Sequence, residues 1–437
     1  MNISRILVPA IVLAASAGGA FAAKLDLTAE ADFKAVSYVN LKNLAPSAGN
    51  GPYFFENAAL GFTVKNIKLP AYEESTMDIG VGFRAVGIAG STTAYRQPFA
   101  MAASRYPDSS FTPFMERAYV KVNKLLDYDI TFTAGRQPFS LASGLALSDD
   151  GAGLTGLRMK FNSIWRELAG QLFAFQPKAE DSASGGVSIA GASIELPSEG
   201  LWQIYDFWEF DRKTGKVLES PESRATRHFA GVNYTLRQGR LAFEGEAAIE
   251  RGSAKTDGGE VSFKGAAFII SGKWNQPMGA MGNGTGRVAF GRGSGDKSST
   301  RDVDETFFPS YGHRTNGLER SGFGEIYGAS LYDALGSSTS TANGLPEGMS
   351  GIQMVNIGAT LPVYKGIYTD IDLFFYEAAA STAKEGKKLG TEWDIKLTCP
   401  IAEKLKLSAV YAMFSPGKAY PSHAPVHKFA IQTSARF

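Results

Sequence analysis

The chain has 437 residues and a single cysteine, so an internal disulfide is excluded, and the length is too great for a small disulfide-stapled domain. The formal net charge is +1, which gives no support to nucleic-acid binding. Glycine is abundant at 49 residues, aromatic residues make up 12% and charged residues 20%. This mixture suits a large β-barrel in lipid, with apolar residues outside, polar residues inside and glycine in turns.

The N-terminus predicts a secretory signal peptide over residues 1–22. It has Arg5, an apolar run from Ile6 to Ala15, and a small-residue segment ending at Ala22, after which we expect cleavage. The apolar run is too short for a membrane-spanning helix, and no later window holds 18 uncharged apolar residues. We therefore expect one exported domain, residues 23–437, without helical anchors or a linker.

Alternation with a period of two begins directly after the predicted cleavage site. Apolar residues occupy odd positions from Leu25 to Ala35, and charged residues occupy most of the even positions between them. A helix would scatter these charges around its surface, whereas a strand puts them on one side. The same pattern recurs at 58–64, 77–85, 118–122, 157–161, 241–249, 367–375, 393–399 and 405–411.

The last segment, His427 to Phe437, has the same alternation and ends on an aromatic residue. It resembles the terminal signal strand of bacterial outer-membrane barrels, so we interpret Phe429, Ile431 and Phe437 as an insertion signal for the barrel-assembly machinery. The alternative is an amphipathic edge strand of a soluble sheet. Together with the signal peptide, this strand favours an all-β transmembrane barrel in the outer membrane of a diderm, Gram-negative-type bacterium.

Turn lengths set the predicted strand count. Short turns at 125–128, 162–166, 197–200, 238–240, 362–366 and 400–404 alternate with longer polar segments. Such barrels have short periplasmic turns, long external loops and both chain ends in the periplasm. If 294–350 is one external loop, the alternation gives 18 antiparallel strands. Their expected centres are Ala31, Leu60, Val81, Val120, Phe132, Met159, Leu172, Gly191, Asp206, Val232, Gly245, Phe268, Val288, Ile357, Ile371, Ile395, Ala409 and Ile431.

Four stretches between residues 110 and 420 carry a family resemblance. They are Thr133-Ala-Gly-Arg-Gln137; Phe243-Glu-Gly-Glu-Ala247; Gly293-Ser-Gly-Asp296 followed by Phe307-Phe-Pro-Ser-Tyr-Gly-His-Arg314; and Thr391-Glu-Trp-Asp-Ile395 leading to Phe414-Ser-Pro-Gly417. In this order and spacing they resemble the alginate-export family of outer-membrane barrels, whose members have 18 strands. The resemblance implies a channel for a polysaccharide or another solute.

A barrel of this size is too wide for its side chains to fill, so the polar strand faces should line an aqueous lumen. The residues expected to line the lumen and select for charge are Arg84, Arg117, Lys121, Arg136, Arg158, Lys160, Arg237, Glu244, Glu246, Asp370, Asp372, Glu392 and Asp394. The alternative is that they only solvate the lumen and pair across strands. A polyuronate exporter should have a strongly positive lumen, whereas this lining looks balanced, so a general diffusion porin is the second interpretation.

Two features of the predicted lumen have a specific expectation. Arg136 falls on the outward face of its strand, and a bulge at Gly135 would turn it into the pore; otherwise it is an interfacial residue. The 294–350 loop is longer than a connection needs and is expected to fold inward or cap the mouth. Its candidate gating residues are Asp296, Asp304, Glu305, His313 and Arg314.

An enzyme or adhesin is a weaker alternative. The four histidines have no recognisable nucleophile motif beside them, and no metal-binding spacing or phosphate-binding loop is present. We therefore expect a channel rather than an enzyme, with no cofactor. The expected partners are outer-membrane lipid, the barrel-assembly machinery and small hydrophilic or saccharide solutes.

Overall fold

The structure is a computed structural model. It describes residues 23–44, 51–91, 110–149, 151–165, 167–179, 186–212, 224–256, 259–297, 302–311, 315–316, 319–320, 323–328, 345–364, 366–382 and 386–437. The predicted signal peptide, residues 1–22, lies outside these ranges and remains a prediction.

Eighteen long strands form the barrel. They are β1 (Lys24–Val39), β2 (Tyr53–Lys68), β3 (Thr76–Gly90), β4 (Phe114–Asn123), β5 (Ile130–Gln137), β6 (Leu154–Trp165), β7 (Leu168–Ala179), β8 (Gly186–Pro197), β9 (Leu201–Arg212), β10 (Arg224–Gln238), β11 (Leu241–Thr256), β13 (Ala266–Pro277), β14 (Asn283–Gly293), β18 (Met349–Tyr364), β19 (Ile367–Ser381), β20 (Lys388–Ala402), β21 (Leu405–Pro416) and β22 (Val426–Arg436).

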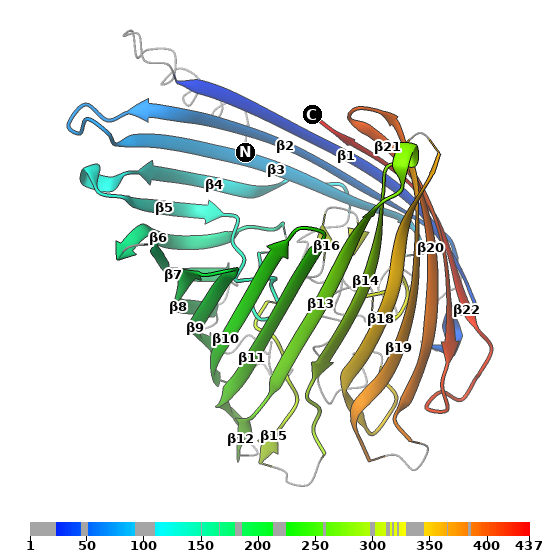
Figure 1. The fold of residues 1–437 in the computed structure, drawn as a ribbon. Coiled ribbons are helices and arrows are strands. Elements are labelled where there is room, and N and C mark those ends of the chain that lie inside the picture. The colour runs from blue at the N-terminus through cyan, green and yellow to red at the C-terminus, as the bar shows by residue number, and fades with distance from the viewer. Residues whose placement is uncertain are drawn as a thin grey trace.

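Each barrel strand pairs antiparallel with the next, and the last pairs with the first. β22 lies against β1 from Glu30↔Arg436 to Val39↔His427, which closes the sheet. Figure 1 shows the blue first strands beside the red last strands at this seam. Phe437 continues the closure, since its N–H donates to the Ala29 carbonyl oxygen over 2.8 Å. A closed sheet has no free edge, which a barrel in lipid requires.

The prediction of 18 strands is confirmed, and every expected centre lies inside its strand. The predicted short turns lie on the rim that also holds the start of β1 and the end of β22, so the other rim is the extracellular one. The two segments without a clean apolar face, 187–196 and 201–211, are β8 and β9. Their inner faces carry apolar side chains because segments folded into the lumen pack against them.

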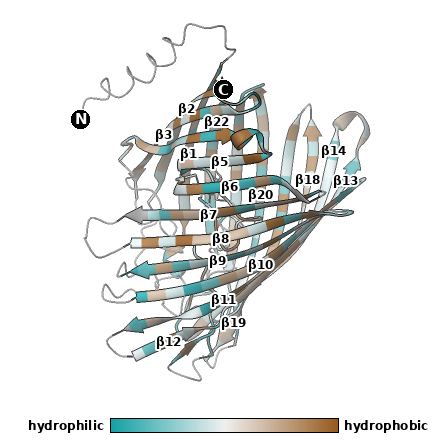
Figure 2. Ribbon diagram, turned by 90° about the vertical axis from the view of Figure 1, so that its left-hand side faces the viewer, coloured by the Kyte–Doolittle hydropathy of each residue, from teal (hydrophilic) through white to brown (hydrophobic). Residues whose placement is uncertain are grey.

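The outer wall is apolar. Exposed outward side chains include Leu60 on β2, Leu172 on β7, Val288 on β14 and Ile431 on β22. Figure 2 shows the alternation of hydrophobic and hydrophilic residues along the strands. Side chains that would be buried in a soluble core are exposed here, which is the arrangement of a barrel whose outer surface contacts lipid.

Short elements lie between the barrel strands. β12 (Gly259–Phe263) pairs with the top of β11 and, in parallel, with β15 (Val303–Asp304). β16 (Thr315–Asn316) pairs with β17 (Glu319–Arg320). The described residues also form the single-turn 3₁₀ helices η1 (Leu41–Asn43), η3 (Leu125–Asp127) and η4 (Gly279–Met281). Among the described residues, no helix is both long and apolar enough to span a membrane.

Candidate functional site in the barrel lumen

The alternation predicted a lumen lined by polar residues. In the structure, part of the inner wall is apolar. Two clusters of buried apolar side chains lie on the inner wall, where segments of the long loops fold inward. We name these the 138–149 segment, which follows β5, and the 302–311 and 323–328 segments, which belong to the loop between β14 and β18. Each is held by buried carboxylates on the barrel wall.

A buried ion pair marks the wall at β9–β11. Arg227 on β10 lies between Glu209 on β9 and Glu250 on β11, and all three side chains are about 0–1% exposed. Its Nη1 donates to Glu250 over 2.9 Å, and Nε donates to Glu209 over 3.0 Å. These residues meet because the register pairs neighbouring inward positions of the three strands. A charge triad so fully removed from water requires partners for every polar group.

The 302–311 segment supplies the remaining partners of this triad. Arg227 donates to the main-chain carbonyl oxygen of Phe308 over 2.6 Å, and the Phe308 N–H donates to Glu250 over 2.8 Å. The Ser310 hydroxyl donates to Glu209. The guanidinium of Arg227 also lies 5.5 Å from the centre of the Phe308 ring. The 302–311 segment is therefore fastened to the inner wall by charge-assisted hydrogen bonds.

The 138–149 segment docks beside it. Glu246 on β11 accepts hydrogen bonds from the N–H and the hydroxyl of Ser143, and from the Tyr205 hydroxyl over 2.7 Å. The two inward segments also bind each other, because the N–H of Tyr311 donates to the Ala146 carbonyl oxygen over 3.1 Å. Glu246, predicted to line the lumen, is thus buried beneath a loop.

The 323–328 segment docks on the opposite wall. Glu392 on β20 accepts from the main-chain N–H groups of Glu325, Ile326 and Tyr327 at 2.6–2.8 Å. Asp394 accepts a further bond from the Glu325 N–H over 3.0 Å. The wall carboxylates thus satisfy three successive amides that would otherwise be buried without acceptors.

Glu325 itself forms an ion pair with the same wall. Lys428 on β22 donates to its carboxylate over 2.7 Å, and Lys34 on β1 lies 3.9 Å away. Burial alone would raise the pKa of Glu325, but the two ammonium groups outweigh it and hold this pKa well below its ordinary value of 4.5. Tyr327 stacks on Phe414 with ring centres 4.7 Å apart. Because β1 and β10 lie nine strands apart in the ring, the loop between β14 and β18 contacts both sides of the barrel.

A third region of the lumen, on β3–β6, is basic. Arg84 pairs with Glu116 over 3.2 Å and Lys121 with Asp78 over 3.3 Å. Arg158 donates to the neutral Gln171, and neither Lys160 nor Arg117 has a carboxylate partner within the described part of the chain. We name Arg84, Arg117, Lys121, Arg158 and Lys160 the basic wall.

Arg117 extends over its neighbouring strands. A Cβ at Gly82 would lie 2.6 Å from the Arg117 Nε, and one at Gly61 would lie 3.4 Å from its Nη2. These two glycines make room for the guanidinium. The Nε is buried and has no hydrogen-bond partner among the described residues.

The acidic pair predicted on β19 is neutralised. Asp372 and Asp370 bind Arg287 on β14, which also donates to the Thr360 hydroxyl over 2.7 Å. The cross-strand register brings these residues together, because Arg287 pairs with Gly358 and Gly358 pairs with Asp372. The remaining predicted lumen residues, Arg237 and Glu244, are exposed near the periplasmic rim.

The expectation of a bulge at Gly135 is wrong. Strand pairing is continuous through Gly135 and Arg136 on both sides of β5, and the register shift of this region lies in β4, where Glu116 is the extra residue. Arg136 therefore stays on the outward face with its partners Ala118 and Thr155, and its Nε donates to the Ala152 carbonyl oxygen over 2.8 Å. It holds a loop at the rim and does not point into the pore.

Three of the five predicted gating residues lie in the described part of the loop between β14 and β18. Asp304 is part of β15, and burial of its carboxyl group raises its pKa. Asp296 and Glu305 lie beside it, where the Asp296 N–H donates to the Thr306 hydroxyl and the Glu305 carbonyl oxygen accepts from Ser294. His313 and Arg314 lie outside the described residues.

The sequence prediction missed the residues that hold the loop. Arg227, Glu209 and Arg287 occupy inward positions of strands whose alternation was read mainly from their apolar residues. Their spacing could have placed them inside, but no sequence pattern shows which loop they bind. No group of three or more His, Cys, Asp or Glu suited to a metal ion occurs in the described ranges.

Comparison with protein-family models and with curated proteins gave no match. Solved structures do match. OccK8 (OprE) of Pseudomonas aeruginosa is 8% identical with a TM-score of 0.54, over 96% of this chain and 99% of that chain. Acinetobacter baumannii OccAB1 is 11% identical, covers 95% and 98%, and has a TM-score of 0.54. A BenF-like porin from Pseudomonas fluorescens Pf-5 is 12% identical, covers 94% and 98%, and has a TM-score of 0.53.

At sequence identities of 8–12%, the structural likeness shows that this chain shares the fold of these proteins. The chain has the closed 18-strand barrel fold of these structures, and its apolar outer wall suits a barrel surrounded by lipid. The resemblance to the alginate-export family finds no support in these comparisons, because no family model matches and none of the three structures named above carries that family's name.

Proposed function

We propose that the protein is an outer-membrane channel for small hydrophilic solutes, and that the basic wall favours solutes carrying a carboxylate. The observation that carries this proposal is the uneven use of the lumen charges. The sequence contains similar numbers of lumen acids and bases, but charges already bound to other groups act little on a passing ion. The relevant quantity is the charge left after pairing.

The predicted lumen acids are nearly all bound. Glu246 holds the 138–149 segment, Glu392 and Asp394 hold the 323–328 segment, and Asp370 and Asp372 bind Arg287. Glu244 is the exception. By contrast, Arg117, Arg158 and Lys160 form no ion pair in the described part of the chain, and the carboxylate of Glu195 acts on Arg158 from a greater distance. A low-dielectric wall with unneutralised cations raises the local concentration of anions.

The inward segments favour a small solute over a polymer. Three loop segments occupy the extracellular half of the lumen and are fixed to opposite walls by buried ion pairs and hydrogen bonds. A long polyuronate would require these contacts to open, whereas a small carboxylate requires only the path that they leave. A polyuronate such as alginate is therefore a second candidate, which rests on the sequence resemblance and the basic wall.

Solute uptake into proteoliposomes tests this proposal. Swelling rates would be compared for a small monocarboxylate, a neutral sugar of similar size and an oligouronate. We expect faster entry of the monocarboxylate than of the neutral sugar, and a smaller difference in Arg158→Gln. Equal rates for both small solutes would leave a general diffusion porin. Inhibition of monocarboxylate entry by the oligouronate would extend the binding to polyuronates, and no swelling with any solute would contradict the channel.

A further inference from the structure

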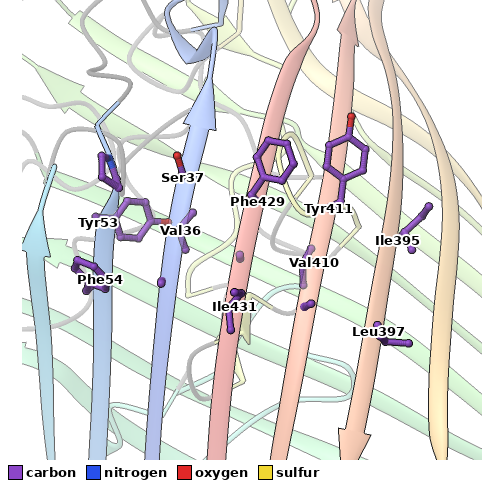
Figure 3. A pocket seen from close by; sticks show the side chains of 14 residues that line it. Val36, Ser37, Tyr53, Phe54, Ile395, Leu397, Val410, Tyr411, Phe429 and Ile431 are labelled. Carbon is purple, nitrogen blue, oxygen red and sulfur yellow. The ribbon is translucent and has the colours of Figure 1, made fainter.

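The outer wall has an apolar hollow beside the seam of the barrel. It lies over β20, β21, β22, β1 and β2 and has a volume of about 550 Å³. Figure 3 shows the residues that line it, among them Phe54, Phe429, Ile431, Tyr411 and Leu397. This volume is within the range of small-molecule sites, and its lining is almost entirely apolar.

The hollow follows from the order of side-chain sizes across the strands. In one row the register sets Leu397, Ala409, Ile431, Ala35 and Phe54 side by side. Small residues therefore alternate with large ones, and Ala35 and Ala409 form low points between taller neighbours. Each of the two alanines thus lies between larger apolar side chains, which leaves a slot in this row.

The next row toward the extracellular rim contains polar as well as apolar side chains. It contains Tyr411, Phe429 and Ser37, which the register pairs in that order. The Tyr411 hydroxyl lies 2.9 Å from Nδ1 of His427, at the start of β22. The hollow thus has an apolar body and the Tyr411 side chain in its lining, and the imidazole that this phenol contacts lies outside the lining.

Its depth identifies the leaflet. Ser37 is two residues from the extracellular end of β1, and His427 is one residue from the extracellular end of β22. The hollow therefore opens toward the outer half of the bilayer. We propose that it is a binding site for an acyl chain of an outer-leaflet lipid, whose head region hydrogen-bonds with Tyr411 and His427.

A lipid chain suits this site better than a second copy of the protein. Ile431 and Phe54 flank Ala35 on the two neighbouring strands, and they are 59% and 43% exposed. A thin flexible chain can enter between them, whereas the wall of a second barrel would rest on these two side chains and leave the slot empty. Filling the slot gives the exposed apolar surface its missing van der Waals contacts.

Native mass spectrometry of the purified full-length protein in a mild detergent tests the site. The protein would be titrated with lipid A and, separately, with dipalmitoyl-phosphatidylethanolamine. Ala35→Phe fills the slot, and Ala247→Phe on β11 is the matched control, because it makes the same change at an exposed outward position on the opposite side of the barrel. Heat-dependent mobility on gels would verify that each variant folds.

We expect one tightly bound lipid A on the wild type and on Ala247→Phe, and at least a tenfold weaker complex with Ala35→Phe. Tyr411→Phe should weaken lipid A binding while leaving the slot open. Equal binding by wild type and Ala35→Phe, or no bound lipid on the wild type, would overturn the proposal. A dimer or trimer that Ala35→Phe dissociates would assign the hollow to a second copy. Equal affinity for both lipids would overturn the role of the head region.

Discussion

The guanidinium of Arg227, in the wall of the barrel, donates a 2.6 Å hydrogen bond to the main-chain carbonyl oxygen of Phe308, in a loop folded into the lumen. The same guanidinium binds Glu209 and Glu250, so one side chain connects two wall carboxylates to the 302–311 segment. The position of this segment across the lumen therefore depends on a buried charge.

Replacing that charge should release the segment. In Arg227→Met, Glu209 and Glu250 are left buried together without a cation, a change that costs about 3–5 kcal/mol. We expect a larger and noisier single-channel conductance in planar bilayers and a lower unfolding temperature. Arg237→Met, at an exposed lumen position, is the control. Wild-type conductance in Arg227→Met would show that the segment is held by other contacts.

The opposite anchor predicts a pH dependence. The pKa of Glu325 is lowered when the 323–328 segment is docked, so Glu325 stabilises docking at pH values above about 4.5 and loses this contribution as the pH falls below that value. Lys428→Met should alter the conductance at neutral pH, whereas Lys406→Met should not. The difference in conductance between the wild type and Lys428→Met should be constant from about pH 8 to about pH 5 and change only in stronger acid. A difference that already disappears near neutral pH would contradict this role of Glu325.

An ionisable pair lies on the outer wall, within its apolar belt. Nε2 of His228 on β10 lies 2.6 Å from Asp206 on β9, whose side chain is 57% exposed. Asp206 lies on the same face of β9 as Trp202, four residues nearer the extracellular rim. For a tilted strand this spacing is about 10 Å along the barrel axis, which puts Asp206 inside an apolar belt about 25 Å tall.

Charges at this depth are costly in lipid. We expect His228→Leu to lower the free energy of unfolding in vesicles by about 2 kcal/mol, because it leaves Asp206 without its partner. The double variant with Asp206→Leu should be at least as stable as the wild type. A double variant less stable than His228→Leu would show that the carboxylate has another partner in the membrane.

Phe437 extends the pairing between the last strand and the first, and we predict that it supports barrel closure. Phe437 exchanges two main-chain hydrogen bonds with Ala29, at 2.8 and 3.0 Å, and its ring lies 5.6 Å from the Lys404 ammonium. Deleting Phe437 should reduce the folded protein in the outer membrane several-fold, measured by heat-modifiable mobility in membrane fractions. Phe437→Tyr keeps both bonds and the ring and should be close to wild type. Unchanged levels of the deletion variant would exclude a role of Phe437 in closure.

The strands could be predicted from sequence because period-two alternation and turn length are local properties. The positions of β8 and β9 followed from turn parity, although apolar residues such as Ile189 and Phe207 fall on their inward faces. Those residues face inward because Phe307 and other loop residues pack on them. This packing joins residues about 100 positions apart, which no local pattern encodes.

The candidate site was less predictable for the same reason. Alternation placed Glu246 and Glu392 inside the barrel, but the amides that they bind belong to distant loops. The apparent balance of lumen charge therefore did not represent the charge that a solute meets. Arg136 was misplaced because an unbroken register, rather than a bulge, connects it to Ala118.

The most direct test of the central claim is the reversal potential of single channels in planar bilayers under a salt gradient. The basic wall predicts anion preference in the wild type, and Arg117→Gln should shift the preference toward cations because it removes a lumen charge without a carboxylate partner in the described part of the chain. Arg136→Gln removes the same charge from the outward face and should leave the reversal potential unchanged. Cation preference in the wild type, or equal shifts in the two variants, would contradict this account of the lumen.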